Sequence, residues 1–148
     1  MISSITNGGK THITYAHRHF PKIIELKCKK CKSKVIAKNL NASDEIEHFI
    51  DISNIEKTWN LLCVNCTYRK DLVWEELTEF DLWLKTEIRN INFWAWNTDH
   101  LKMIIKKLKK EDLASDKWMF FESYIPKIWL IKFNSNKEIR KLEKLIQK

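Results

Sequence analysis

The first half of the chain alternates apolar and polar residues in short runs. Five segments combine β-branched or aromatic residues with period-two spacing, which is typical of strands: 10–20, 23–27, 35–38, 58–62 and 71–75. Between the third and fourth segments, residues 39–57 are acidic and mixed, and Ser43 is a suitable N-cap for a helical turn over 43–50. The pattern therefore predicts a β-rich unit that carries an acidic insertion.

From about residue 78 the spacing of apolar residues becomes helical. Thr78 and Asp81 resemble a capping box, with Asp in the usual Glu position, ahead of a helix over 81–88. Asn97 or Thr98 can cap the next helix, whose apolar residues follow the spacing i, i+3, i+4, i+7: Leu101, Ile104, Ile105 and Leu108. This part of the chain therefore predicts helices.

Three further helices are expected towards the end of the chain. The first begins at Ser115 and the second at Pro126, a residue suited to a helix start. The last begins at Ser135, which together with Glu138 matches a capping box. The chain thus predicts an α+β protein in three parts: a flexible arm at 1–12, a β-rich zinc ribbon at 13–76 and a small helical module at 77–148.

The four cysteines form two Cys-x-x-Cys pairs separated by 31 residues, and each pair follows a predicted strand. Because Zn²⁺ prefers four ligands in a tetrahedron, the two pairs can share one ion. A redox dithiol would need a Cys-x-x-Cys at a helix start in a βαβ unit, which neither pair has. We predict one structural Zn²⁺ held by Cys28, Cys31, Cys63 and Cys66, with a [4Fe–4S] cluster as an open alternative.

Two features depart from the usual pattern of such a site. Glycine commonly follows the second cysteine of each pair because that position favours positive φ, but Lys32 and Thr67 stand there. Either these residues adopt the strained conformation or the next residue takes the turn. The spacer is also longer than the roughly 15–20 residues of compact pairs, so the insertion at 39–57 should project from the ribbon.

The net charge is +8, and basic stretches lie on both sides of an acidic segment at 72–99. Lysine dominates over arginine, which favours phosphate contacts over base reading. The lysines near the cysteines can instead compensate the formal charge of roughly −2 on a four-thiolate zinc centre. The candidate nucleic-acid-binding residues, for DNA or RNA, are Lys29, Lys30, Lys32, Lys34, Arg69, Lys70, Lys102, Lys106, Arg140 and Lys141.

A protein-interaction or homodimerisation module without nucleic-acid binding is the alternative function. We expect this protein to have no enzymatic activity and no small-molecule substrate, because the sequence contains no recognisable set of catalytic residues. His100 follows Asp99 as in His-Asn-His nucleases, but no later histidine completes that motif. His12, His17 and His19 suit an exposed strand. No apolar run reaches the ~18–20 residues of a membrane span or forms a signal peptide, so we expect a cytoplasmic protein with reduced thiols.

A tryptophan-rich segment at 94–101 lies after the cysteine pairs, and we expect its residues Trp94 and Trp96 to anchor the core. Together with the two Cys-x-x-Cys pairs it resembles uncharacterised bacterial zinc-ribbon proteins, which carry a Trp-Ala-aromatic-Asn-x-x-His-Leu element and a basic helical tail. The matching residues are Trp94, Ala95, Trp96, Asn97, His100 and Leu101. The resemblance extends from about residue 23 to the end and implies an architecture but no activity.

Overall fold

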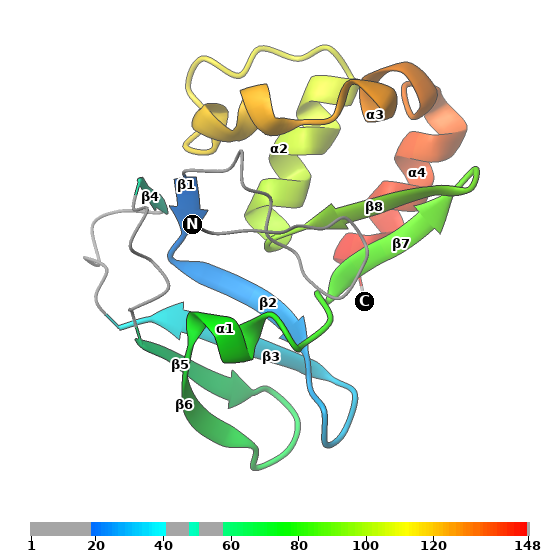
Figure 1. The fold of residues 1–148 in the computed structure, drawn as a ribbon. Coiled ribbons are helices and arrows are strands. Elements are labelled where there is room, and N and C mark those ends of the chain that lie inside the picture. The colour runs from blue at the N-terminus through cyan, green and yellow to red at the C-terminus, as the bar shows by residue number, and fades with distance from the viewer. Residues whose placement is uncertain (1–18, 41–47, 51–57, 148) are drawn as a thin grey trace.

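The computed structural model describes residues 19–40, 48–50 and 58–147, and in it the protein is a mixed α+β structure (Figure 1). The arm predicted at 1–12, the histidines at 12 and 17, and most of the insertion at 39–57 lie outside the described residues. Among the described residues, no helix is both long enough and apolar enough to cross a membrane.

A four-stranded antiparallel sheet, called here the main sheet, forms one end of the molecule (Figure 1). Its strand order is β2-β3-β5-β6. The strands comprise β2 (Ile23–Lys27), β3 (Lys34–Asn39), β5 (Thr58–Cys63) and β6 (Arg69–Val73). The strands predicted at 23–27, 35–38 and 58–62 are therefore confirmed.

The last predicted strand, 71–75, is confirmed only in part. The main sheet ends at Val73, and Trp74 and Glu75 begin a short helix, α1 (Trp74–Leu77). Glu76 accepts a hydrogen bond from the Val73 amide at 3.1 Å, which favours the helical turn at this point. In this turn Trp74 and Leu77 are both buried.

A second, two-stranded sheet joins β1 (His19–Pro21) to β4 (His48–Ile50) in antiparallel register. The helical turn predicted over 43–50 is therefore wrong for residues 48–50; its first residues lie outside the described part of the chain. A short run such as His-Phe-Ile is compatible with both a helix and a strand. Pairing with β1, a tertiary interaction, favours the strand.

The helix predicted over 81–88 is wrong: residues 84–88 form the first strand of a β-hairpin made of β7 (Leu84–Ile88) and β8 (Ile91–Ala95), and residues 81–83 precede it without helical structure. Leu84 and Ile88 are buried and four positions apart, a spacing that lies on one face of a helix and also on one face of a strand. The two residues between the strands decide the case, because Arg89 and Asn90 have φ values of 54° and 63°. Two consecutive positive φ values fit a type I′ hairpin turn.

The helix predicted after Asn97 is confirmed as α2 (Thr98–Leu108). The Asn97 Oδ1 atom accepts a hydrogen bond from the His100 amide at 2.9 Å, so Asn97 is the N-cap. Its Nδ2 atom donates to the Ile23 carbonyl at 2.7 Å and thereby ties α2 to the main sheet. The Glu25 carboxylate, also buried, accepts hydrogen bonds from the amide and the hydroxyl of Thr98.

The last three helical elements follow the prediction with two differences. They are a 3₁₀ helix, η2 (Met119–Tyr124), then α3 (Lys127–Lys132) and α4 (Asn136–Ile146). The helix expected from Ser115 is thus a 3₁₀ helix that starts later. The predicted capping box is absent, because the Ser135 side chain does not bond an amide of the first turn. Its hydroxyl bonds the Glu138 carboxylate instead, which holds the pKa of that carboxyl below its ordinary value.

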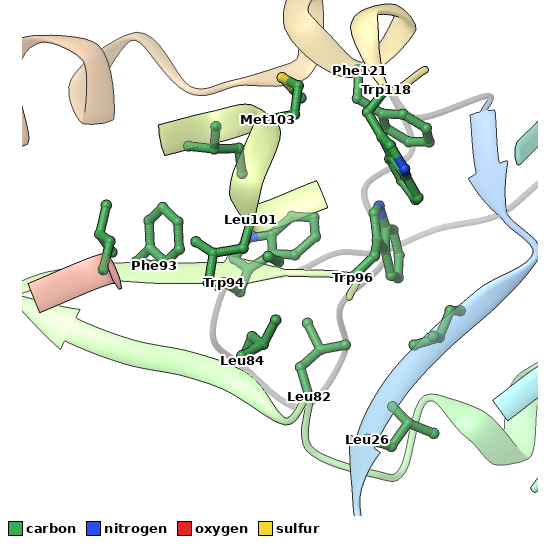
Figure 2. Packing of buried hydrophobic residues seen from close by; sticks show 14 of the residues in the cluster. Leu26, Leu82, Leu84, Phe93, Trp94, Trp96, Leu101, Met103, Trp118 and Phe121 are labelled. Carbon is green, nitrogen blue, oxygen red and sulfur yellow. The ribbon is translucent and has the colours of Figure 1, made fainter. Parts of the chain in front are cut away.

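The buried apolar side chains of the main sheet, the hairpin and the helices form one continuous cluster. Figure 2 shows that Leu26 of β2, Leu82 just before β7, Leu84 of β7, and residues of β8 and α2 contribute to it. A row of tryptophans runs through the cluster, with ring centroids 5.5 Å apart for Trp59–Trp74 and 6.4 Å for Trp74–Trp96. Trp94 and Trp96 are buried, so their predicted role as core anchors is confirmed.

Replacing Asn97 with alanine is expected to destabilise the protein by about 2–3 kcal/mol. Loss of the N-cap accounts for about 1 kcal/mol, and the Ile23 carbonyl would lose the donor that Asn97 supplies, a comparable further cost. Denaturant unfolding measures the effect. Asn97→Asp is the matched control for the cap, because it keeps the acceptor for His100 but not the donor to Ile23. Equal stability of Asn97→Ala and the unmodified protein would show that the cap is unimportant.

Candidate metal centre

The four cysteines lie in two turns at the same end of the main sheet. The first turn joins β2 to β3 and contains Cys28 and Cys31; the second runs from Cys63, the last residue of β5, to β6 and contains Cys66. We call these turns the first and second knuckle. β3 and β5 are neighbours and antiparallel, with Val35 paired to Cys63, so both knuckles are placed side by side. The site therefore depends on the pairing of strands that are distant in the sequence.

The sulfur positions fit a single metal ion. All four Sγ atoms lie within 4.8 Å of one another. Across the knuckles, the Sγ atoms of Cys31 and Cys63 are 3.4 Å apart, and those of Cys28 and Cys66 are 3.8 Å apart. Zn–S bonds of ~2.3 Å in a tetrahedron require sulfur–sulfur edges of about 3.8 Å. The cluster thus has the donor atoms and the spacing to hold one ion.

The two knuckles share the same local hydrogen-bond pattern. Cys28 Sγ accepts from the amides of Lys30 and Cys31, at 3.4 and 3.5 Å. Cys63 Sγ accepts from the amides two and three residues ahead of it, both at 3.4 Å. The sulfur of Cys66 accepts a further amide, that of Tyr68, at 3.4 Å. Because these donors face the sulfurs, each turn stabilises negative charge on its thiolates.

The acidities of the thiols differ within the cluster. Burial raises the pKa of Cys28, but amide hydrogen bonds from Cys31 and Lys30 outweigh it and hold that pKa below the ordinary value. The pKa of Cys31 is lowered to about 6, first by the Ser33 amide and further by Asn65 and the neighbouring cysteines, which together outweigh burial. The Tyr68 amide lowers the pKa of Cys66, but burial and the neighbouring cysteines together raise it to about 12. Four sulfurs at this spacing resist full ionisation without a cation between them.

Lys32 occupies the position after the second cysteine of the first knuckle, and its φ of 67° lies in the left-handed region. Of the two alternatives considered for this turn, the strained one is therefore confirmed. Its amide donates to the Cys28 carbonyl at 3.0 Å, which closes the turn. Such a conformation costs a non-glycine residue roughly 1–2 kcal/mol. A metal that fixes the knuckle would offset this strain.

The burial of the site suits a structural role. Cys28 and Cys63 are buried, and Cys31 and Cys66 are half-buried against the hydrophobic cluster. An ion bound by all four sulfurs would have a complete tetrahedral shell, with no position left for a reacting water. The arrangement can thus tie two turns together and stabilise the sheet between them.

The predicted basic residues near the knuckles have different surroundings. Lys29 places its Nζ atom 4.4 Å from the centre of the Phe80 ring, a cation–π contact. The Nζ atom of Lys34 lies 4.0 Å from Glu25 Oε1, so its charge is partly balanced. Four others are exposed at this end of the molecule: Lys30, Lys32, Arg69 and Lys70.

The predicted basic residues of the helices lie elsewhere. Lys102 and Lys106 are on α2, and Arg140 and Lys141 are on α4. These two helices pack on each other and on the β7–β8 hairpin, away from the knuckle turns (Figure 1). Lys106 is also paired with Asp116 at 3.0 Å. The structure therefore separates the basic residues into two groups instead of joining them on one surface.

Sequence reasoning missed four residues that lie on one face of the main sheet beside the predicted cations. Lys27 and Lys38 are exposed, Ile36 is half-buried, and Leu62 is 50% exposed. The alternation within each strand indicated which residues share a face, but only the register between strands shows that the four are neighbours.

The fold and the cysteine cluster define a class: an α+β protein with a four-cysteine site that can bind a metal ion. Comparison with protein-family models, with curated proteins and with solved structures finds no match for this chain. The resemblance to bacterial zinc-ribbon proteins thus stays a prediction, and function has to be argued from the site itself.

Proposed function

We propose that this chain is a non-catalytic, zinc-stabilised protein that binds nucleic acid mainly through phosphate contacts. The single observation that supports zinc is the set of four sulfurs within 4.8 Å. Zn²⁺ is the redox-inert ion that tetrahedral thiolate sites favour in proteins. A [4Fe–4S] cluster places eight atoms between its cysteines and needs a wider cage. The proposal assumes a reducing compartment such as the cytosol, where the thiols remain available.

Charge around the knuckles supports the nucleic-acid part of the proposal. Lys30, Lys32, Arg69 and Lys70 are exposed at the metal-centre end of the main sheet, and Lys27 adds to them. These five cations exceed the roughly −2 formal charge of a four-thiolate zinc centre, so a positive surplus remains after compensation. Lysine dominates the set, which favours phosphate contacts without sequence reading.

Charge reversal of Lys30 and Arg69 to glutamate is expected to weaken nucleic-acid binding at least about tenfold at about 0.1 M salt, where the Debye length is roughly 10 Å. Fluorescence anisotropy with a labelled oligonucleotide measures the affinity. The matched control reverses Lys102 and Arg140, which changes the net charge equally but on α2 and α4; it should leave the affinity within about threefold, because salt screens distant charges. An equal loss in both variants would show that overall charge, and not the knuckle end, carries the binding.

The alternative is a zinc-stabilised protein-interaction or homodimerisation module without nucleic-acid binding. It is supported by exposed apolar side chains, with Val64 in the second knuckle 61% exposed and Ile131 on α3 65% exposed. Self-association in sedimentation that persists at high salt, without a mobility shift on DNA or RNA, would favour this alternative over nucleic-acid binding.

A further inference from the structure

One face of the main sheet carries charged and apolar side chains in an ordered arrangement. Along β3 and β5, buried residues such as Ala37 and Leu61 alternate with residues that point to the opposite face. The buried side is closed by Trp59, Trp74 and their neighbours. We call the other side the open sheet face; its residues include Glu25, Lys27, Lys34, Ile36, Lys38, Asn60, Leu62, Arg69 and Asp71.

The strand register gives the order of these side chains across the open sheet face. The middle row runs from Glu25 on β2 through Ile36 on β3 and Leu62 on β5 to Arg69 on β6. On the knuckle side of this row, Lys34 is paired with Lys27. In the row on the far side, Lys38 lies between Ile23 and Asn60. The apolar pair Ile36–Leu62 therefore has cations on three sides.

The carboxylates of the same face are already engaged. Asp71 accepts a hydrogen bond from the Asn60 side chain at 2.8 Å. Glu25, at the β2 end of the middle row, accepts from Thr98 at the start of α2 and lies 4.0 Å from Lys34. Four cations thus stand against two carboxylates among the described residues of this face. The face is complementary to a polyanion.

Leu62, the exposed leucine in the middle row, indicates which chemical groups the partner offers. Leu62 is 50% exposed and lies directly opposite Arg69. A partner that offered only phosphates would make no use of an apolar side chain between the cations. Unstacked bases do offer apolar faces, and they stack on arginine guanidinium groups. Next to Ile36 the face opens into a cleft of about 280 Å³ between β2 and the start of α2, whose lining includes Trp118 and also the carboxylates of Glu25 and Asp99.

The shape of the face disfavours a double helix. In a duplex the bases are stacked inside, and protein reaches their edges through the major groove, about 12 Å wide, with a helix or a two-stranded ribbon. Four strands spaced ~4.8 Å apart span about 14 Å before side chains are counted. The main sheet is therefore too broad to enter the groove, and Leu62 at its centre would reach no base.

We infer that the open sheet face binds single-stranded nucleic acid, with phosphates on Lys27, Lys34 and Lys38 and bases against Leu62 and Arg69. This inference rests on the proposed function and adds the form of nucleic acid and the surface. It predicts that a single strand binds more tightly than a duplex of the same sequence and length. It also predicts that an uncharged substitution on this face changes the affinity.

The test uses the full zinc-loaded chain with a labelled 12-nucleotide single strand and the matching duplex, followed by anisotropy. Leu62→Ser is expected to weaken single-strand binding about fivefold, from the loss of apolar contact. The slope of affinity against salt should stay unchanged, because no phosphate contact is removed. Ile131→Ser, at another exposed apolar position, on α3, is the matched control and should leave the affinity unchanged.

A gain-of-affinity variant covers the case in which Leu62→Ser fails to fold. Leu62→Trp adds an aromatic ring at the same position and is expected to tighten single-strand binding about fivefold or more. If the duplex binds as tightly as the single strand and neither variant at Leu62 changes the affinity, this inference is wrong while the proposed function stands. If the chain binds neither form of nucleic acid, the proposed function itself is wrong.

Discussion

Removal of the metal with a chelator is expected to unfold the main sheet. The two knuckles bring Cys31 close to Cys63 and Cys28 close to Cys66 across strands that are distant in sequence, so one ion bound there would hold both turns in register. Structural Zn²⁺ sites contribute about 10–16 kcal/mol in peptides, which is as large as the ~5–15 kcal/mol total stability of an ordinary domain. Without the ion, four closely spaced sulfurs and a strained Lys32 would remain.

Far-UV circular dichroism during heating, combined with metal analysis, measures this effect. The melting temperature should fall by tens of degrees, or the cooperative transition should vanish, and readdition of Zn²⁺ should restore it. Cys28→Ser should act in the same way because the shell loses a thiolate. Ser115→Ala, an exposed position remote from the site in sequence, is the control. A protein shown to be metal-free that melts at the original temperature would rule out a structural metal.

Replacement of Trp96 with alanine is expected to destabilise the protein by about 3–5 kcal/mol, the usual cost of emptying a large core site. The side chain is fully buried, with its ring centroid 6.4 Å from that of Trp74 and 5.1 Å from that of Trp94. Its carbonyl accepts a hydrogen bond from the Glu25 amide at 2.8 Å. Trp96 therefore contacts both the main sheet and the elements after residue 77, and a cavity there weakens both.

Guanidinium denaturation followed by circular dichroism gives the free energy of unfolding. Ile131→Ala serves as the control, since an exposed side chain should change the stability by no more than about 0.5 kcal/mol. A loss below about 1 kcal/mol for Trp96→Ala would contradict the packing described here. The Leu26–Leu82 bridge and the hydrogen bond from the Trp83 amide to the Glu25 carbonyl also cross the module boundary predicted near residue 76.

The parts of the fold that were predicted correctly depend on local signals. Asn97 is followed by apolar residues at helical spacing, and an N-cap acts on amides only two or three positions away, so α2 could be found from the sequence. The first cysteine of each knuckle likewise bonds amides two and three residues ahead. These interactions form within a few residues, whatever the rest of the chain does.

The secondary structure was predicted wrongly where the spacing of apolar residues fits both a helix and a strand. Leu84 and Ile88 suit a helix and a strand equally, and the hairpin was missed because Arg89 and Asn90 are not the Asn-Gly pair that usually marks its turn. His48–Ile50 forms a strand because β1 is available to pair with it. In both cases pairing with another strand determines the secondary structure, and local spacing does not show which strand is available for pairing.

The sequence by itself determined the chemistry available to this protein: four thiolates in two equal pairs, a lysine-rich surplus of positive charge and a capped amphipathic helix after Asn97. Tertiary structure decided how these groups are combined. Strand register brings the sulfurs within 4.8 Å, places Leu62 between cations, and leaves the basic residues of α2 and α4 apart from those of the knuckles. The physical reason is that residue types and short spacings fix local conformation, whereas a shared surface depends on which distant strands pair and in what register.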